Sequence, residues 1–253
     1  MACMELFEVE SLLGRFVTEV AQLLDPPAIW AHGSLALGDF QPGRSDLDLV
    51  AVIAEPLTPG LTARLTALHE RLLREEPAAA KLHCAYLPIA DIADVEINHY
   101  NFAHGHAQRR PVSPVSRCEL LRGGRVLAGL SPAELLPPVS DEELAAYVRH
   151  MLRTYYLPVV TGSPSAWFSD VWVDQVTLGF ARAAVTLRDG RLITKREALE
   201  ELLRLGVPPR LVADIAGRRY GEAHKTGLNW RIRRALLFRR ALAGQIRSVS
   251  AEG

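Results

Sequence analysis

A glycine–serine pair and two nearby aspartates are the residues of this chain best suited to chemistry. Gly33 and Ser34 follow the short apolar run 28–31, which predicts a buried strand that ends at a turn. Glycine at this point lets the backbone approach a ligand closely, and a short helix that begins at Ser34 presents free N–H groups and a hydroxyl. A phosphate group requires donors of this kind.

The aspartates lie at the start of a second predicted strand. Asp46 and Asp48 alternate with leucines, and the apolar run continues to Ala54. Because alternate residues of a strand share a face, both carboxylates point the same way. Two carboxylates at the mouth of a core repel each other, and burying them unpaired is costly. A divalent cation removes this conflict, since Mg²⁺ prefers oxygen ligands together with substrate phosphates.

Each half of this pattern also has a structural interpretation, in which the glycine and serine form an ordinary turn and the aspartates are solvated. The two halves are separated only by a short helix and the turn 41–44, which favours a functional site. The pattern Gly33-Ser34-x(11)-Asp46-x-Asp48 resembles the signature of the polymerase-beta-like nucleotidyltransferase superfamily. Within it, the chain most resembles the aminoglycoside 3''-adenylyltransferases, which modify streptomycin and spectinomycin.

This resemblance implies an adenylyltransferase with a role in antibiotic resistance. The enzyme would transfer AMP from its co-substrate ATP to a hydroxyl of an aminoglycoside-like small molecule. The resemblance implies two Mg²⁺ ions, held on Asp46 and Asp48, and a triphosphate bound at Gly33, Ser34 and Ser45.

The nucleotide contacts implied by the resemblance continue in the second half of the chain. The runs 176–182 and 190–195 are similar to family segments whose arginine and lysine serve the nucleotide, which implies these roles for Arg182 and Lys195. Tyr220 stands where the family has a tyrosine at the nucleotide. A lysine in the first turn of a helix is slightly unfavourable, and a phosphate there would compensate. Arg182 and Tyr220 could also be a salt-bridged arginine and a core aromatic.

The third predicted strand, around 82–87, departs from the family pattern. Related enzymes carry a glutamate there that acts as general base toward the acceptor hydroxyl, and the corresponding residue here is His83. Histidine can accept a proton because its ordinary pKa of about 6.5 is near neutrality. It is a poorer Mg²⁺ ligand than a carboxylate. His83 is therefore either a replacement base or a hydrogen-bonded strand residue in a nucleotide-binding protein without catalysis.

The acceptor-selecting residues of the family are not clearly reproduced. The family's acidic residue aligns close to Trp172, with Asp170 and Asp174 on either side. Aromatic and acidic side chains suit a polycationic, hydroxyl-rich sugar, and we expect these three residues to contact the acceptor. They could equally belong to a helix cap and a core. The sequence also leaves open an acceptor of another kind, such as a metabolite or a protein hydroxyl.

Apolar periodicity divides the chain near residue 130. The expected fold class is an α/β (α+β) nucleotidyltransferase domain with a small mixed sheet, residues 1–130, followed by an all-helical C-terminal domain, residues 131–253. The stretch from about 90 to 135 has no regular pattern. Its histidines, His99, His104 and His106, are expected in a polar loop without a metal.

Helix signals are regular after residue 138. Serine or threonine followed three residues later by glutamate, at Ser140 and Thr194, predicts two capped helix starts. The arginine-rich segment near the end of the chain predicts a basic amphipathic helix.

Composition limits the remaining possibilities. The formal net charge is zero, so a broad nucleic-acid surface is not expected. Three cysteines without paired spacing predict neither a disulfide framework nor a zinc module. No apolar stretch is long enough to span a membrane, and a basic leader is lacking. We therefore expect a cytoplasmic protein that binds a nucleoside triphosphate and a small hydroxyl-bearing acceptor, whose oligomeric state the sequence does not set.

Overall fold

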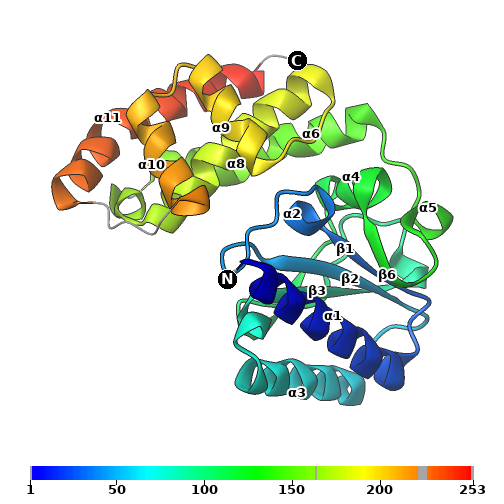
Figure 1. The fold of residues 1–253 in the computed structure, drawn as a ribbon. Helices are drawn as coiled ribbons and strands as arrows, with labels where there is room; N and C mark the ends of the chain where they lie inside the picture. Colours follow the sequence, from blue (N-terminus) through cyan, green and yellow to red (C-terminus); the bar gives the residue numbers. More distant parts are fainter. Residues whose placement is uncertain (1, 163, 222–226, 252–253) are drawn as a thin grey trace. The chain divides into compact units, whose positions relative to one another are not determined.

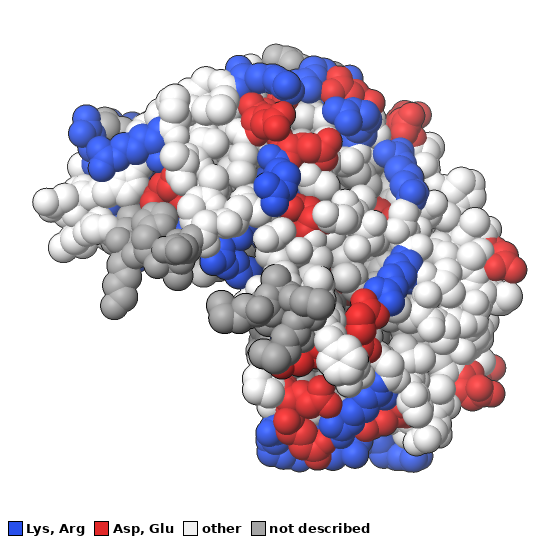
Figure 2. Space-filling model, in the orientation of Figure 1, with Lys and Arg blue, Asp and Glu red and all other residues white. Residues whose placement is uncertain are grey.

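The computed structural model describes residues 2–162, 164–221 and 227–251. The chain forms two compact units, Met1–Val139 and Ser140–Gly253. On the face shown in Figure 2, basic and acidic side chains are interspersed, which agrees with the formal net charge of zero. No helix in the described part of the chain has both the length and the apolar character needed to cross a bilayer.

The first unit is built on a mixed six-stranded sheet (Figure 1). Its strand order is β5-β4-β3-β2-β1-β6, in which β2 and β3 are parallel and the other neighbours are antiparallel. The strands are β1 (Ala28–His32), β2 (Leu47–Ile53), β3 (Leu82–Pro88), β4 (His99–Ala103), β5 (His106–Arg110) and β6 (Arg125–Gly129).

Helices cover both faces of this sheet, because its central strands are apolar on both sides (Figure 1). On one face, Ile29 packs in a core with Phe16 and Leu65 from two long helices. Its neighbour Trp30 points to the other face and packs with Leu120. The helices are α1 (Ala2–Leu24), α2 (Gly33–Ala36), α3 (Pro59–Glu75), α4 (Pro114–Gly123) and α5 (Pro132–Leu135), with 3₁₀ turns at Pro77–Lys81 and Ile89–Asp91.

The stretch from 90 to 135, expected to be irregular, contains β4, β5, α4 and β6. The expectation of a polar loop is wrong for His99 and His106, which lie in strands. The edge strand β5 is polar and largely exposed, so it carries no alternating apolar pattern. Backbone pairing with β4 defines it instead. His104 and Gly105 form the two-residue hairpin turn, and both have positive φ, as a type I′ turn requires.

The second unit is helical throughout its described secondary structure. A π-helical turn joins its first two helices. Its elements are α6 (Asp141–Met151), the π-turn Leu152–Tyr156, α7 (Leu157–Thr161), a 3₁₀ turn Pro164–Phe168, α8 (Asp170–Asp189), α9 (Lys195–Arg204), α10 (Pro209–Tyr220) and α11 (Leu228–Ala251).

Both predicted helix starts are confirmed, since the hydroxyls of Ser140 and Thr194 cap α6 and α9. The expected fold class is confirmed as well. The units divide between 139 and 140 rather than near 130, because α5 and the buried Leu136 pack with Trp30 in the core of the first unit. Among the described cysteines, Cys84 and Cys118 are buried thiols.

Candidate active site

The turn after β1 packs the backbone of Gly33 directly against the carboxylate of Asp48. Gly33 has a φ of +62°, in the left-handed region that favours glycine. A Cβ atom at this position would lie 2.9 Å from Asp48 Oδ2. Both constraints call for glycine here. Ser34 follows as the second residue of the four-residue helix α2.

Asp48 lies in a row of ionisable residues that crosses three neighbouring strands. Its Cα pairs with that of His32 on the antiparallel strand β1 and with that of His83 on the parallel strand β3. Because residues paired across neighbouring strands project to the same face, an imidazole stands on each side of the carboxylate. We refer to His32, Asp48 and His83 as the histidine–aspartate row.

This row keeps Asp48 ionised. Burial alone would raise the pKa of Asp48, but the contact with His83 and the charge of His32 outweigh it and lower the pKa to about 2. The Asp48 Oδ1 atom lies 3.4 Å from His83 Nδ1. The carboxylate is therefore charged at any physiological pH.

A third histidine joins the row from the β4–β5 hairpin. The rings of His83 and His104 meet edge to face, with centroids 4.4 Å apart. The His83 side chain is only 5% exposed. Its Nε2 atom has no hydrogen-bond partner within the described residues. Burial and the nearby His83 lower the pKa of His104. Local sequence patterns assign no role to His104, because they do not reveal the β4–β5 hairpin that places it.

A buried carboxylate, Glu119 on α4, pairs with the first residue of the row. Its Oε2 atom lies 2.9 Å from His32 Nδ1. Burial lowers the pKa of His32, but the bond to Glu119 and the charge of Asp48 outweigh it, and the pKa is raised. Sequence reasoning missed Glu119. The serine before Pro114, which caps α4, was the signal that could have revealed its helix.

Asp46 and Ser45 lie at the entry to β2. Asp46 Oδ1 lies 3.3 Å from Lys81 Nζ. Ser45 is buried, and its Oγ accepts a hydrogen bond of 2.9 Å from the Gln41 backbone N–H. In the structure Ser45 closes the turn that leads into the strand and thereby fixes where the strand begins.

The oxygen donors of Asp46 and Asp48 fit a divalent cation. Asp46 directly precedes β2 and Asp48 is its second residue, and Gly33 places only backbone against the Oδ2 atom of Asp48. Among the described residues, no group of three or more His, Cys, Asp or Glu side chains is arranged to hold a metal by itself. A cation here would need phosphate oxygens or water as further ligands, which is the usual coordination of Mg²⁺.

The predicted nucleotide contacts of the second unit lie around one short segment, residues 193–196. Arg182 Nε donates a hydrogen bond of 2.8 Å to the carbonyl oxygen of Ile193. Lys195 begins α9. The guanidinium of the next residue, Arg196, lies 4.0 Å from the centre of the Tyr220 ring. The structure thus brings Arg182, Lys195 and Tyr220 to one region of the helical unit.

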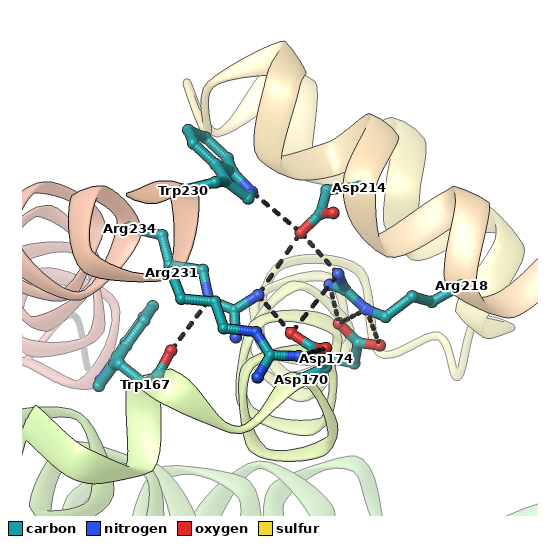
Figure 3. Close-up of polar contacts among 8 residues, drawn as sticks. All are labelled: Trp167, Asp170, Asp174, Asp214, Arg218, Trp230, Arg231 and Arg234. Atoms are coloured by element: carbon teal, nitrogen blue, oxygen red, sulfur yellow. Dashed lines mark hydrogen bonds and ion pairs between the residues drawn. The ribbon is translucent and has the colours of Figure 1, made fainter. Parts of the chain in front are cut away.

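Two of the three predicted acceptor residues are instead held in a cluster of ion pairs (Figure 3). Asp174 lies 2.5 Å from Arg218, and Asp170 lies 2.6 Å from the fully buried Arg234. Figure 3 shows these side chains converging from α8, α10 and α11. We define the arginine–aspartate cluster as Asp170, Asp174, Asp214, Arg218, Arg231 and Arg234.

Trp172 does not take part in the ion pairs of this cluster. The residue is 41% exposed. It lines an open hollow of about 500 Å³ together with Pro158, Val159, Ser165, Ala166 and Ser169. The structure therefore separates the environment of this aromatic residue from that of the two aspartates.

Comparisons with known proteins agree with this architecture. Residues 13–94 match the family model described as a nucleotidyltransferase domain. The fold matches the crystal structure of spectinomycin adenyltransferase AAD(9) from Enterococcus faecialis with ATP and spectinomycin, with a TM-score of 0.69. The match has 14% sequence identity and covers 98% of this chain and 100% of that chain. No protein with a curated description matches the sequence.

The matched domain contains the histidine–aspartate row and the Gly33–Ser34 turn, whereas Glu119 lies beyond it. The chain therefore contains a nucleotidyltransferase domain in residues 13–94, which makes it an enzyme of the nucleotidyltransferase type, and its fold is similar to that of spectinomycin adenyltransferase AAD(9).

Proposed function

We propose that this chain transfers AMP from ATP to a hydroxyl group of a small molecule in a Mg²⁺-dependent reaction. The observation that carries the proposal is the arrangement at Asp48, where an ionised carboxylate meets a glycine backbone at the turn into Ser34. The structure of AAD(9) was determined with ATP and spectinomycin, which supports the choice of nucleotide.

In this proposal the residues of the first unit orient the triphosphate. Asp46 and Asp48 would hold the cations, two ions as the family resemblance implies. Gly33 and Ser34 offer backbone and hydroxyl donors to phosphate oxygens, and Ser45 keeps the aspartate strand in register. When bound, Mg²⁺ would neutralise part of the phosphate charge and lower the pKa of the acceptor hydroxyl.

His83 is proposed as the proton acceptor of the reaction. The acceptor oxygen forms a bond to the α-phosphorus of ATP, the bond to pyrophosphate breaks, and the hydroxyl proton passes to the imidazole. Positioning of the reactants would supply most of the acceleration. Arg182, Lys195 and Tyr220 are proposed to hold the nucleotide from the second unit.

The acceptor is proposed to be an aminoglycoside-like molecule, with Asp170, Trp172 and Asp174 as its contacts. One observation favours a different hydroxyl acceptor, such as an uncharged metabolite. Both aspartates are already paired with arginines, so little negative charge is left to recognise a polycation. Incubation with Mg-ATP and separate candidate acceptors, streptomycin and spectinomycin first, would distinguish the two. The product must gain the mass of one AMP.

Calorimetric titration with ATP and Mg²⁺ tests the nucleotide site itself. The native protein is compared with an Asp46→Asn, Asp48→Asn double variant, which keeps the shape of the site and removes its charge. We expect metal-dependent binding that the double variant loses. Equal binding by both proteins, or none by the native protein, would contradict the proposed site. Binding without pyrophosphate release for any acceptor would indicate a non-catalytic nucleotide-binding protein.

A further inference from the structure

His32 and Glu119 form a buried polar pair that has no role in the reaction proposed above. The two side chains are 13% and 7% exposed. Glu119 comes from α4, which packs on both β1 and α2. Its neighbours on the helix, Cys118 and Leu120, are buried as well, so Glu119 lies in a closely packed part of α4.

Stability alone gives little reason for this pair. Replacing a buried ion pair by apolar residues of similar volume is often neutral or stabilising, because the charges lose their hydration. The position of the His32–Glu119 pair in the chain is more informative than its effect on stability. His32 directly precedes Gly33 and Ser34, and it stands opposite Asp48 in the strand register. The pair therefore lies at the junction of the two halves of the proposed nucleotide site.

The geometry fixes how the imidazole is presented. The Glu119 carboxylate lies 2.9 Å from Nδ1, and a carboxylate at one ring nitrogen sets the orientation and tautomer of the ring. His32 is the residue before α2, but its side chain does not cap this helix. The Nδ1 atom faces Glu119, which leaves Nε2 as the ring atom that can meet a ligand.

We propose that His32 contacts the phosphate groups of the bound nucleoside triphosphate and that Glu119 is the residue that positions it. This inference rests on the proposed function. Asp46 and Asp48 place negative charge where the triphosphate must lie, so a nearby donor would balance part of their repulsion. A histidine whose ring orientation is held by a buried carboxylate provides such a donor. It loses less side-chain conformational entropy on binding than a long, flexible side chain would.

Calorimetry with Mg-ATP on His32→Gln, Glu119→Gln and the double variant tests this assignment. Loss of a charge-assisted hydrogen bond predicts an affinity about tenfold lower for His32→Gln and a smaller loss for Glu119→Gln. Because Glu119 acts through His32, the double variant should bind within about twofold of His32→Gln. Glu134→Gln, which removes a carboxylate from an exposed helix cap in the same unit, is the control and should bind normally.

Unchanged affinity in both single variants, or losses that simply add in the double variant, would overturn the assignment. A melting temperature measured without ligand separates a folding defect from a binding defect. If Glu119→Gln does not fold, Glu119→Asp takes its place, and it should weaken binding less than His32→Gln does. The proposed function fails if the native protein does not bind Mg-ATP or releases no pyrophosphate with any acceptor. The assignment of His32 and Glu119 is judged by comparing variants with a native protein that binds Mg-ATP, so the two failures are distinguishable.

Discussion

At the scale of single residues, the site depends on contacts that only particular side chains can make. Gly33 is the clearest example, since it combines a positive φ with a backbone packed on Asp48. Gly38, two residues after the end of α2, provides a matched comparison. It has a φ of +72°, but the space around it is open.

We therefore expect Gly33→Ala and Gly38→Ala to differ in function more than in stability. Each should cost about 1 kcal/mol of unfolding free energy because alanine is strained at positive φ. Gly33→Ala should also lose Mg-ATP affinity, since the new methyl group displaces the Asp48 carboxylate. Urea unfolding and calorimetry measure the two effects, and equal affinity in both variants would exclude close packing at Gly33 as a requirement.

His83→Ala should lower turnover by roughly 100-fold or more while sparing Mg-ATP binding, if the imidazole takes the acceptor proton. Pyrophosphate release with a working acceptor measures the first effect, and calorimetry measures the second. His150→Ala, at an exposed position of α6, is the control. Unchanged turnover would remove His83 from the mechanism and leave it as a strand residue beside Asp48.

At the scale of elements, buried polar groups join helices to each other and to the sheet. His69 of α3 bonds to the hydroxyl of Tyr86 on β3 at 2.9 Å and stacks on Phe102 of β4. In the second unit, the arginine–aspartate cluster joins α8, α10 and α11. Each of these contacts connects elements that are distant in sequence, so each should affect the stability of its unit.

Burial lowers the pKa of His69 to about 3, and this makes the first unit sensitive to acid. Between about pH 3 and 6.5 the unfolded chain binds a proton at this residue that the folded chain does not, so stability falls as pH falls through that window. The slope from this group approaches about 1.4 kcal/mol per pH unit. Urea unfolding between pH 4.5 and 7 should show a shallower slope for His69→Gln, which does not titrate. An identical slope would contradict a neutral buried imidazole.

Removing one partner of the arginine–aspartate cluster should destabilise the second unit strongly. Arg234→Met removes the fully buried partner of Asp170, which keeps its contact with Arg231, so we expect a loss of about 3 kcal/mol, the lower end for a broken buried ion pair. Arg240→Met, at an exposed position of the same helix, should change stability by less than about 0.5 kcal/mol. Denaturant unfolding monitored by circular dichroism compares them. Similar small effects in both would mean that solvent reaches the cluster.

At the scale of the whole molecule, each unit has its own buried interior. In the first unit, the core includes α5 and Leu136, which lie after the division near residue 130 that the sequence suggested. The match to AAD(9) extends over both units, so the fold of this enzyme includes the helical part.

A fragment of residues 1–139 should fold cooperatively, and one of residues 1–130 should be less stable. The shorter fragment loses the buried Leu136, whose side chain contributes about 2 kcal/mol by burial, together with the capped helix α5. Urea unfolding of both fragments measures the difference. Equal stability would place the end of the first unit near residue 130.

The sequence by itself determined the features that depend on neighbouring residues. The alternation at Asp46 and Asp48, the glycine at 33 and the helix caps at Ser140 and Thr194 are local patterns, and periodicity or capping chemistry revealed them. The succession of the first three strands along the chain also followed from local patterns, whereas the fold class came from the resemblance of the Gly33–Asp48 pattern to nucleotidyltransferases.

The tertiary structure decided what depends on distant pairing. The polar edge strand β5 has no apolar alternation, so only its backbone partner β4 defines it. That hairpin brings His104 to His83, and α4 brings Glu119 to His32 across a long separation in sequence. The pairing of Asp174 with Arg218 likewise depends on how helices pack. Local sequence patterns do not encode such contacts, because they arise only when separate elements bury a common surface.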